Sequence, residues 1–260
     1  MSRMTIKFLG LKLIMVDLQE IIDHVRREEA LSMQRSIQLI TLNPEMMVEA
    51  KRNELFKEVV TRSNWVVPDG VGIVLAMRFL SVCRKEVFSK KLILKRITGT
   101  DLIYELAKNL ETEGRFFLFG GVDGITNKVS VNLQKLFPHI KIVGIEQGYN
   151  FIDEDIVRKI RKTEPNILLV ALGSPKQEMW INRNLHRMPS VKLAIGVGGA
   201  FDYISGKIKR APLPIRKIGL EWMWRLLKQP SRIQRIFRAT VFFACIILKE
   251  KYFRPNKTQI

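Results

Sequence analysis

The chain has 260 residues, enough for one large α/β domain with an appendage or for two small domains. Hydrophobic residues make up 47% of it and charged residues 27%, a composition that excludes a wholly disordered protein. Lysine and arginine number 44 against 25 acidic residues, and the formal charge of +19 favours an anionic partner. Nucleic acid, phosphorylated small molecules and acidic membranes are the three classes that fit.

Cysteine and histidine usage predicts no metal or redox centre. Cys83 and Cys245 are far apart, and the three histidines are scattered without metal-ligand spacing. At the N-terminus, Arg3, Lys7 and Lys12 interrupt the apolar residues, so no secretory h-region is recognisable. We therefore expect a cytoplasmic protein in a reducing compartment.

An N-terminal hairpin opens the predicted fold. Residues 6–9 and 12–16 flank a Gly-Leu pair, and a helical pattern follows over about residues 18–31. Six further apolar runs alternate with helical patterns, at residues 37–41, 65–67, 115–119, 140–145, 166–172 and 191–195. This alternation predicts an α/β fold with a Rossmann-like, doubly wound, mostly parallel sheet of about six strands.

The first of these strands ends in Thr41-Leu-Asn43-Pro44-Glu. Pro44 suits the first position of a helix, which we expect to continue over residues 48–60. Thr41 and Asn43 therefore lie at a strand-to-helix junction. Their simplest role there is to cap the helix, and ligand binding is the alternative.

The second strand stops at a lone carboxylate, Asp69. Pro68 prevents the strand from continuing, while Gly70 and Gly72 allow a ligand to approach the backbone closely. In open α/β sheets, ligands bind at the carboxyl ends of the strands. Asp69 is thus a candidate for chemistry, with capping of the next helix, predicted over residues 71–82, as the alternative.

A basic stretch over residues 84–96 predicts no particular element, and it ends at Arg96. Thr98 or Thr100 would then cap a helix that runs to about residue 110. The free N–H groups of a helix start attract anions, and Arg96 would add a fixed charge. A solvated surface arginine is the alternative.

The third strand ends in Gly120-Gly121, which suits a nucleotide's phosphate or base but equally a plain tight turn, since no nucleotide-binding glycine fingerprint is present. The acidic residues 153–155 open a helical pattern, where carboxylates favour the helix dipole, so we do not assign them to a metal. Polar residues converge again after residue 172, where Gly173-Ser-Pro-Lys-Gln177-Glu turns the strand into a helix.

From residue 205 the composition changes, with 14 lysines and arginines and two acidic residues up to residue 260. We therefore divide the chain into a Rossmann-like catalytic domain, 1–204, and a basic helical C-terminal appendage, 205–260. Helical patterns cover about residues 215–228 and the chain from Ser231 onward.

The appendage combines basic and aromatic residues with an uncharged run over residues 239–248. Ten residues are too few to span a bilayer, which takes roughly 20. The composition fits a helix lying on an anionic membrane surface. Docking on its own domain or on a second subunit of a homo-oligomer is the alternative, and we expect no nucleic acid because no binding motif for it is present.

Six motifs at these junctions, in this order, resemble the WecG/TagA/CpsF glycosyltransferases. They are Thr41-Leu-Asn-Pro-Glu, Val67-Pro-Asp-Gly-Val-Gly, Arg96-Ile-Thr-Gly-Thr-Asp, Gly173-Ser-Pro-Lys-Gln-Glu, Gly196-Val-Gly-Gly-Ala-Phe-Asp and Gly219-Leu-Glu-Trp. The resemblance covers nearly the whole chain, and the departure from it is a longer stretch at residues 81–95.

The resemblance implies an inverting transfer of a sugar, typically N-acetylmannosamine or its uronic acid, from a UDP donor. The acceptor would be a sugar on undecaprenyl diphosphate, and the product a precursor of a surface polysaccharide or teichoic acid. In that scheme Asp69 is the general base, and Thr41, counted with it as catalytic, positions the sugar together with Asn43. Gln177 hydrogen-bonds in the same pocket, and Arg96 offsets the charge of the diphosphate.

Gly121 and Gly173 complete the core part of the implied substrate site. In the appendage, Arg225, Arg232 and Arg235 match the family's basic positions, and the appendage would reach over the site at the inner face of the cell membrane.

A departing diphosphate requires positive charge or a metal. Because the chain supplies arginines and no metal-ligand cluster, we expect no metal or other cofactor, the UDP-sugar being a substrate. Two alternatives stay open: an NAD-dependent nucleotide-sugar enzyme, which would lack its glycine fingerprint, and a non-enzymatic membrane-associated module that binds a nucleotide or a lipid diphosphate.

Overall fold

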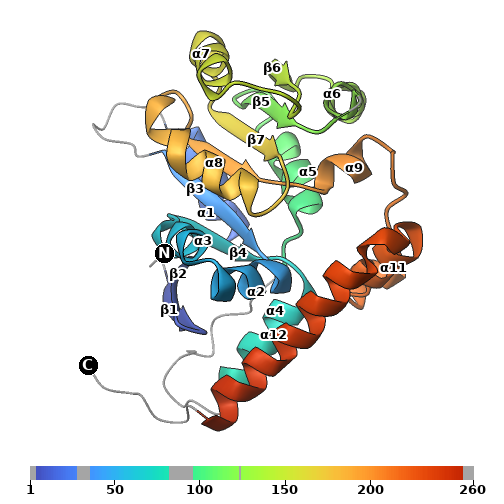
Figure 1. Cartoon of the computed structure of the whole chain (residues 1–260). Helices are drawn as coiled ribbons and strands as arrows, with labels where there is room; N and C mark the ends of the chain where they lie inside the picture. Colours follow the sequence, from blue (N-terminus) through green and yellow to red (C-terminus); the bar gives the residue numbers. More distant parts are fainter. Residues whose placement is uncertain (1–3, 28–35, 82–95, 123, 254–260) are drawn as a thin grey trace.

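The computed structural model describes residues 4–27, 36–81, 96–122 and 124–253, and the basic stretch at 82–95 lies outside them. One sheet with the order β1-β2-β4-β3-β8-β7-β5-β6 forms the centre of the molecule (Figure 1). Its strands are β1 (Met4–Phe8), β2 (Leu11–Met15), β3 (Ile37–Leu42), β4 (Trp65–Pro68), β5 (Arg115–Gly120), β6 (Lys141–Glu146), β7 (Ile167–Ala171) and β8 (Leu193–Gly196).

The α/β class and the mostly parallel sheet are as predicted, but about six strands was too few. The six predicted strands are β3 to β8, and all of their pairings are parallel. The predicted hairpin is β1 and β2, and it extends the same sheet because Met15 of β2 pairs in parallel with Val66 of β4. A single bridging pair of this kind leaves no signature in the sequence.

The helices are α1 (Leu18–Arg26), α2 (Pro44–Arg52), α3 (Glu54–Arg62), α4 (Val71–Ser81), α5 (Gly99–Asn109), α6 (Ile125–Leu136), α7 (Asp153–Thr163), α8 (Lys176–Asn184), α9 (Ala200–Ile204), α10 (Leu213–Lys217), α11 (Glu221–Lys228) and α12 (Ile233–Phe253). Two short 3₁₀ turns, η1 (Leu185–Arg187) and η2 (Pro230–Arg232), precede β8 and α12.

Two predicted helices are each divided in two. The helix expected over residues 48–60 is broken at Asn53, whose Oδ1 accepts from the backbone N–H of Phe56 at 3.1 Å and so begins α3. The helix expected over 215–228 is broken at Gly219, which has a φ of +80°. A Cβ at Gly219 would lie 2.6 Å from Cβ of Val71, so only glycine lets this turn approach α4 so closely.

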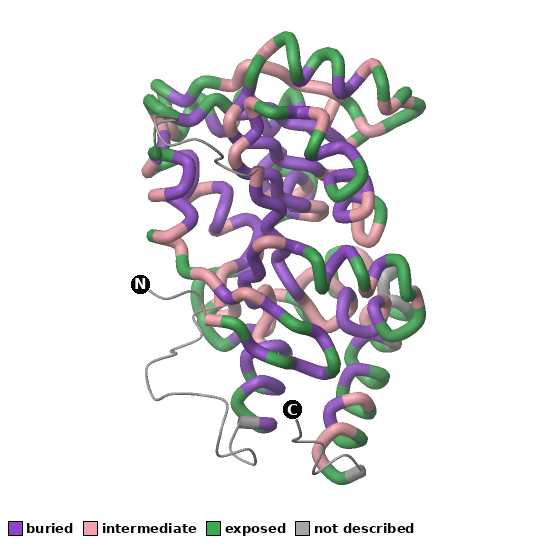
Figure 2. Tube along the Cα trace, turned by 90° about the vertical axis from the view of Figure 1, so that its left-hand side faces the viewer, coloured by how far each residue is buried: buried purple, intermediate pink, exposed green. Residues whose placement is uncertain are grey.

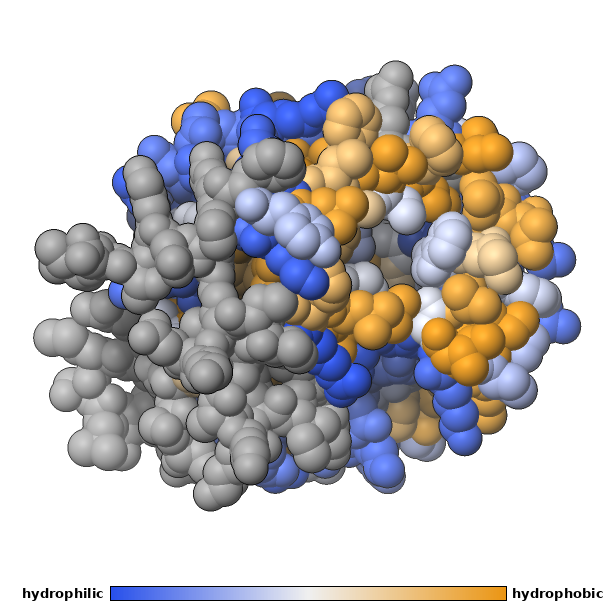
Figure 3. Space-filling model, turned by 90° about the horizontal axis from the view of Figure 1, so that it is seen from below, coloured by the Kyte–Doolittle hydropathy of each residue, from blue (hydrophilic) through white to orange (hydrophobic). Residues whose placement is uncertain are grey.

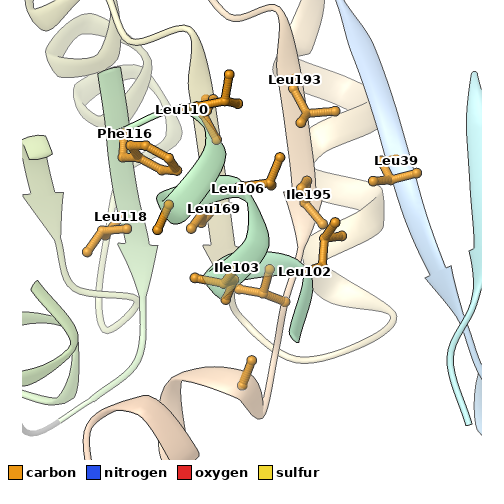
Figure 4. Packing of buried hydrophobic residues seen from close by; sticks show 14 of the residues in the cluster. Leu39, Leu102, Ile103, Leu106, Leu110, Phe116, Leu118, Leu169, Leu193 and Ile195 are labelled. Carbon is orange, nitrogen blue, oxygen red and sulfur yellow. The ribbon is translucent and has the colours of Figure 1, made fainter. Parts of the chain in front are cut away.

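Each face of the sheet has its own apolar layer, because successive strand residues point to opposite sides. Leu39 belongs to the apolar layer that includes residues of α1, α5, α6 and α9, whereas its neighbour Ile40 belongs to the layer that includes residues of α2, α3, α4 and α12. On the far strands, Phe117 and Phe119 pack with α7 and α8. The buried residues form the centre of the molecule in Figure 2, and Figure 4 shows α5 covering the strands of the first face.

The last helix, α12, docks on the domain by one stripe only. Ala239, Phe243 and Ile247, spaced four residues apart, are buried against α2 and α4. Val241 and Phe242 are exposed, and the Phe242 ring lies under the guanidinium of Arg52 at the end of α2. Docking of the appendage on its own domain, considered above as an alternative, is thus observed for this stripe of α12. In the part of the chain that the structure describes, no helix combines the length and apolarity needed to cross a bilayer.

Candidate active site

A cavity of about 770 Å³ opens at the carboxyl ends of four neighbouring strands, β4, β3, β8 and β7. Thr41 is the penultimate residue of β3, Asp69 follows β4, Gly196 ends β8 and Gly173 lies just beyond β7. All four residues line this cavity. Chain order and strand order diverge here, since β3 lies between β4 and β8. This is the position at which doubly wound sheets bind their ligands.

Asp69 lies at the polar end of the cavity, in the turn between β4 and α4. Its backbone N–H donates to the carbonyl of Leu42 at 2.7 Å, which holds the turn against the end of β3. Burial raises the pKa of Asp69 to about 7, the positive charge of Arg96 opposes this rise, and the carboxylates of Glu221 and Asp101 add to it. A carboxyl group that titrates near neutrality is suited to accept a proton.

Arg96 is a partly buried, paired arginine and not a solvated one. One of its terminal nitrogens, Nη2, lies 3.5 Å from Oε2 of Glu221. The other oxygen of Glu221 accepts from Nε of Arg210 at 2.9 Å, and Nη1 of Arg210 lies 2.7 Å from Oδ1 of Asp101. Because Glu221 begins α11 and Asp101 lies in the first turn of α5, this chain of charges fixes the appendage to the rim of the sheet.

The helix cap beside Arg96 is Thr98. Its Oγ1 accepts from the backbone N–H of Asp101 at 3.1 Å and also from Nη2 of Arg210 at 3.1 Å. Of the two predicted caps, Thr98 is therefore the correct one, and Thr100 is buried in α5.

Arg225 reaches the cavity from α11. Its Nη2 lies 3.1 Å from Oδ2 of Asp202, and its guanidinium lies over the ring of Tyr203 at 5.3 Å. A Cβ at Gly199 would be only 2.2 Å from this nitrogen, so the glycine admits the guanidinium. Arg96 and Arg225 thus place two positive charges at the polar end.

Gln177 is held in a buried network at the start of α8. Its Oε1 accepts from the N–H of Gly173 at 3.1 Å, and its Nε2 donates to Oε1 of Glu178 at 2.6 Å. Glu178 is only 2% exposed, and burial raises its pKa. The hydrogen bonds from Gln177 and Ser174 lower the pKa but do not cancel the effect of burial. A Cβ at Gly196 would lie 2.7 Å from both side chains, so this glycine makes room for the pair.

Thr41 and Asn43 combine structural contacts with a place on the cavity wall. The Thr41 hydroxyl is buried and donates to the carbonyl of Gly196 at 3.4 Å, across to β8. Oδ1 of Asn43 accepts from the N–H of Met46 at 3.0 Å, so the capping interpretation of Asn43 is confirmed. Capping and lining are compatible because the cap lies at the strand end that forms the cavity.

Comparison with known proteins identifies the family. Residues 6–257 match the sequence model of the Glycosyl transferase WecG/TagA/CpsF family. The N-acetylglucosaminyldiphosphoundecaprenol N-acetyl-beta-D-mannosaminyltransferase of Bacillus spizizenii is 31% identical over 214 residues, 82% of this chain and 79% of the relative. The enzyme of the same name from Staphylococcus aureus strain MW2 is 26% identical over 253 residues, 97% of this chain and 96% of the relative. The chain belongs to the WecG/TagA/CpsF family of glycosyltransferases.

Seven of the site residues predicted for this glycosyltransferase line one cavity: Thr41, Asn43, Asp69, Arg96, Gly173, Gln177 and Arg225. Gly121 does not line it; its N–H donates to the carbonyl of Ala171 at the end of β7 at 2.9 Å, and its carbonyl accepts from the N–H of Gly148 at 3.0 Å. The backbone of Arg232 is in η2 and that of Arg235 is in α12, but their side chains lie outside the described residues.

Four further residues contact the site of this glycosyltransferase and were not predicted individually. Glu178, Asp202 and Glu221 lie within the family motifs, but no role was predicted for them. Arg210 lies in the basic linker after residue 205, where no pattern distinguishes it from the other basic residues. Asp153 has a structural role, since it accepts from Nε1 of Trp180 at 3.0 Å. Within the described ranges, no three histidine, cysteine or acidic residues come together as a metal site would require.

Proposed function

We propose that this glycosyltransferase moves N-acetylmannosamine from a UDP-sugar to N-acetylglucosamine carried on undecaprenyl diphosphate. The name of both relatives gives this transferred sugar and this acceptor, and the relatives match this chain over most of its length. The observation that carries the proposal is Asp69, a carboxyl group with a pKa of about 7 in a cavity that also presents Arg96 and Arg225.

The reaction is a single displacement that inverts the anomeric carbon. The Asp69 carboxylate accepts the proton of the acceptor hydroxyl while its oxygen forms a bond to that carbon. The bond from the carbon to the UDP oxygen breaks in the same step, and UDP leaves with the electron pair. Asp69 then releases its proton to solvent, and the enzyme returns to its starting state.

The two arginines stabilise the charge that develops on the leaving diphosphate. Guanidinium groups form charge-assisted hydrogen bonds to phosphate oxygens, and such bonds strengthen in a partly buried site. In the structure each arginine is paired with a carboxylate, Arg96 with Glu221 and Arg225 with Asp202. These carboxylates hold the guanidinium groups at the cavity wall before a diphosphate arrives. We propose that this arrangement operates without a metal.

Thr41 acts beside Asp69, where its hydroxyl oxygen accepts a hydrogen bond from a sugar hydroxyl. Asn43 and Gln177 donate to the sugars from their side-chain amides. Gly173 offers its backbone at the same rim. Gly121, Arg232 and Arg235 are proposed as further contacts to the substrates, on the strength of the family motif alone.

We also propose that residues 205–260 act as a unit that brings the enzyme to the inner face of the cytoplasmic membrane. Large apolar side chains are exposed on its helices, at Leu213, Ile218, Leu227, Ile233 and Phe237. Lysines and arginines lie between them in the sequence. Exposed apolar groups beside basic ones favour binding to an anionic bilayer surface.

Incubation with UDP-N-acetylmannosamine and vesicles that contain undecaprenyl-diphosphate N-acetylglucosamine tests the proposed function. We expect release of UDP and an acceptor lipid heavier by one N-acetylhexosamine, with the same rate in the presence of EDTA. The absence of both products would refute the transfer, whereas loss of activity in EDTA and its return with Mn²⁺ would refute metal independence alone.

A further inference from the structure

The cavity changes character along its length. Its polar end holds Asp69, Arg96 and Arg225, whereas its other end lies between α4 and α12. Apolar side chains line that second part, which we call the α4–α12 groove: Leu75, Ala76 and Phe79 from α4, and Phe243, Ile247 and Leu248 from α12.

Helical spacing explains why one face of each helix lines the groove. Positions 72, 75, 76 and 79 share one face of α4, and positions 243, 247 and 248 share one face of α12. The helices α4 and α12 lie side by side (Figure 1), and α4 starts two residues after Asp69. Gly72 lies opposite Phe243, and Nζ of Lys251 lies 3.6 Å from the centre of the Phe79 ring. From Gly72 to Phe79 the groove extends about 10 Å along α4.

The groove exposes apolar surface that the described residues leave uncovered. Leu75 is 56% exposed, Leu248 49% and Phe79 39%. Apolar side chains gather around a hollow on the face seen from below in Figure 3. A contiguous apolar surface that continues into a polar cleft is typical of a binding site for a ligand with both characters.

We infer that the α4–α12 groove binds the isoprene units of a polyprenyl-diphosphate acceptor that lie nearest its diphosphate. This inference rests on the proposed function and adds a subsite to it. The acceptor joins a polar sugar diphosphate to an apolar chain, and one cavity likewise joins a polar end at Asp69 to the apolar α4–α12 groove, which begins at Gly72. A UDP-sugar has no apolar chain and would leave the groove empty.

The test compares two acceptors in the same detergent, one with the undecaprenyl chain and one with the same sugar diphosphate on a single isoprene unit. In the double variant Leu75→Gln/Leu248→Gln, we expect the ratio of kcat/KM for the long to the short acceptor to fall at least tenfold. Leu75→Met/Leu248→Met keeps the apolar surface and retains the wild-type ratio. The matched control Val241→Gln/Phe242→Gln alters exposed apolar residues of α12 outside the cavity and leaves the ratio unchanged.

The outcomes separate the inference from the proposed function. A wild-type enzyme that uses neither acceptor refutes the proposed function. If it uses both and the groove variant keeps the ratio, the inference alone is overturned. If the ratio falls equally in the control variant, the effect comes from general contact with detergent or lipid. If the groove variant sediments as a different oligomer from the wild type, the groove binds a second copy of the chain. Either result overturns the inference.

Discussion

Replacing Asp69 by asparagine removes the proposed base and changes little else in shape. We expect turnover to fall by roughly 10²-fold to 10⁴-fold, the usual contribution of a positioned base. In the wild type, kcat/KM should fall tenfold per pH unit below about pH 7, because the protonated form of Asp69 cannot accept a proton. Asp69→Asn should lack this acid limb.

The same substitution should make the protein more stable at alkaline pH. Raising the pKa of Asp69 from 3.8 to about 7 means that ionisation in the folded state is unfavourable by up to about 4 kcal/mol. Below pH 3.8 the carboxyl is protonated in both folded and unfolded states, and the wild type carries no such penalty. The penalty grows between pH 3.8 and about 7 and is complete above that range, so the gain from asparagine is largest there.

Two measurements decide this prediction: the pH profile of UDP release, and denaturant unfolding at pH 5 and pH 8. Asp155→Asn, an exposed carboxylate on α7, is the control and should change neither. Near-normal turnover of Asp69→Asn would remove Asp69 from the role of base. Equal stability of variant and wild type at pH 8 would refute the account of a strained, buried carboxylate.

Three further variants test other parts of the site. Gly199→Ala places a methyl group against Arg225, so KM for the UDP-sugar should rise about tenfold or more while thermal unfolding stays cooperative; an unchanged KM would exclude Arg225 from donor binding. Glu178→Gln should keep most activity and Glu178→Ala lose at least tenfold in kcat, because a glutamine carbonyl can still accept the hydrogen bond from Gln177; equal loss in both would contradict this supporting role. Leu213→Glu/Ile218→Glu should weaken sedimentation with anionic vesicles and spare activity on the short-chain acceptor, and undiminished sedimentation would exclude α10 as a membrane contact.

Local sequence patterns determined the α/β class, the six parallel strands and the position of Asp69. Apolar runs, prolines and glycines act over a few residues, so they are readable without knowledge of the fold. Asn43 and Thr98 were readable for the same reason, since each cap bonds to a backbone N–H three residues away. The sequence patterns failed to predict the helix breaks at Asn53 and Gly219. The helical pattern continues across both residues, but Asn53 caps a new helix and Gly219 adopts a positive φ.

Tertiary structure alone decided which of these junctions share a site. Parallel strands place all their carboxyl ends on one edge, but only the strand order puts β4, β3, β8 and β7 together and leaves Gly121 outside the cavity. The near-neutral pKa of Asp69 depends on burial and on Arg96, Glu221 and Asp101, which are distant in sequence. The α4–α12 groove likewise exists only because a stripe of α12 docks on the domain and leaves the neighbouring apolar residues uncovered. Charge and apolarity belong to the sequence, whereas their alignment along one cavity is a property of the fold.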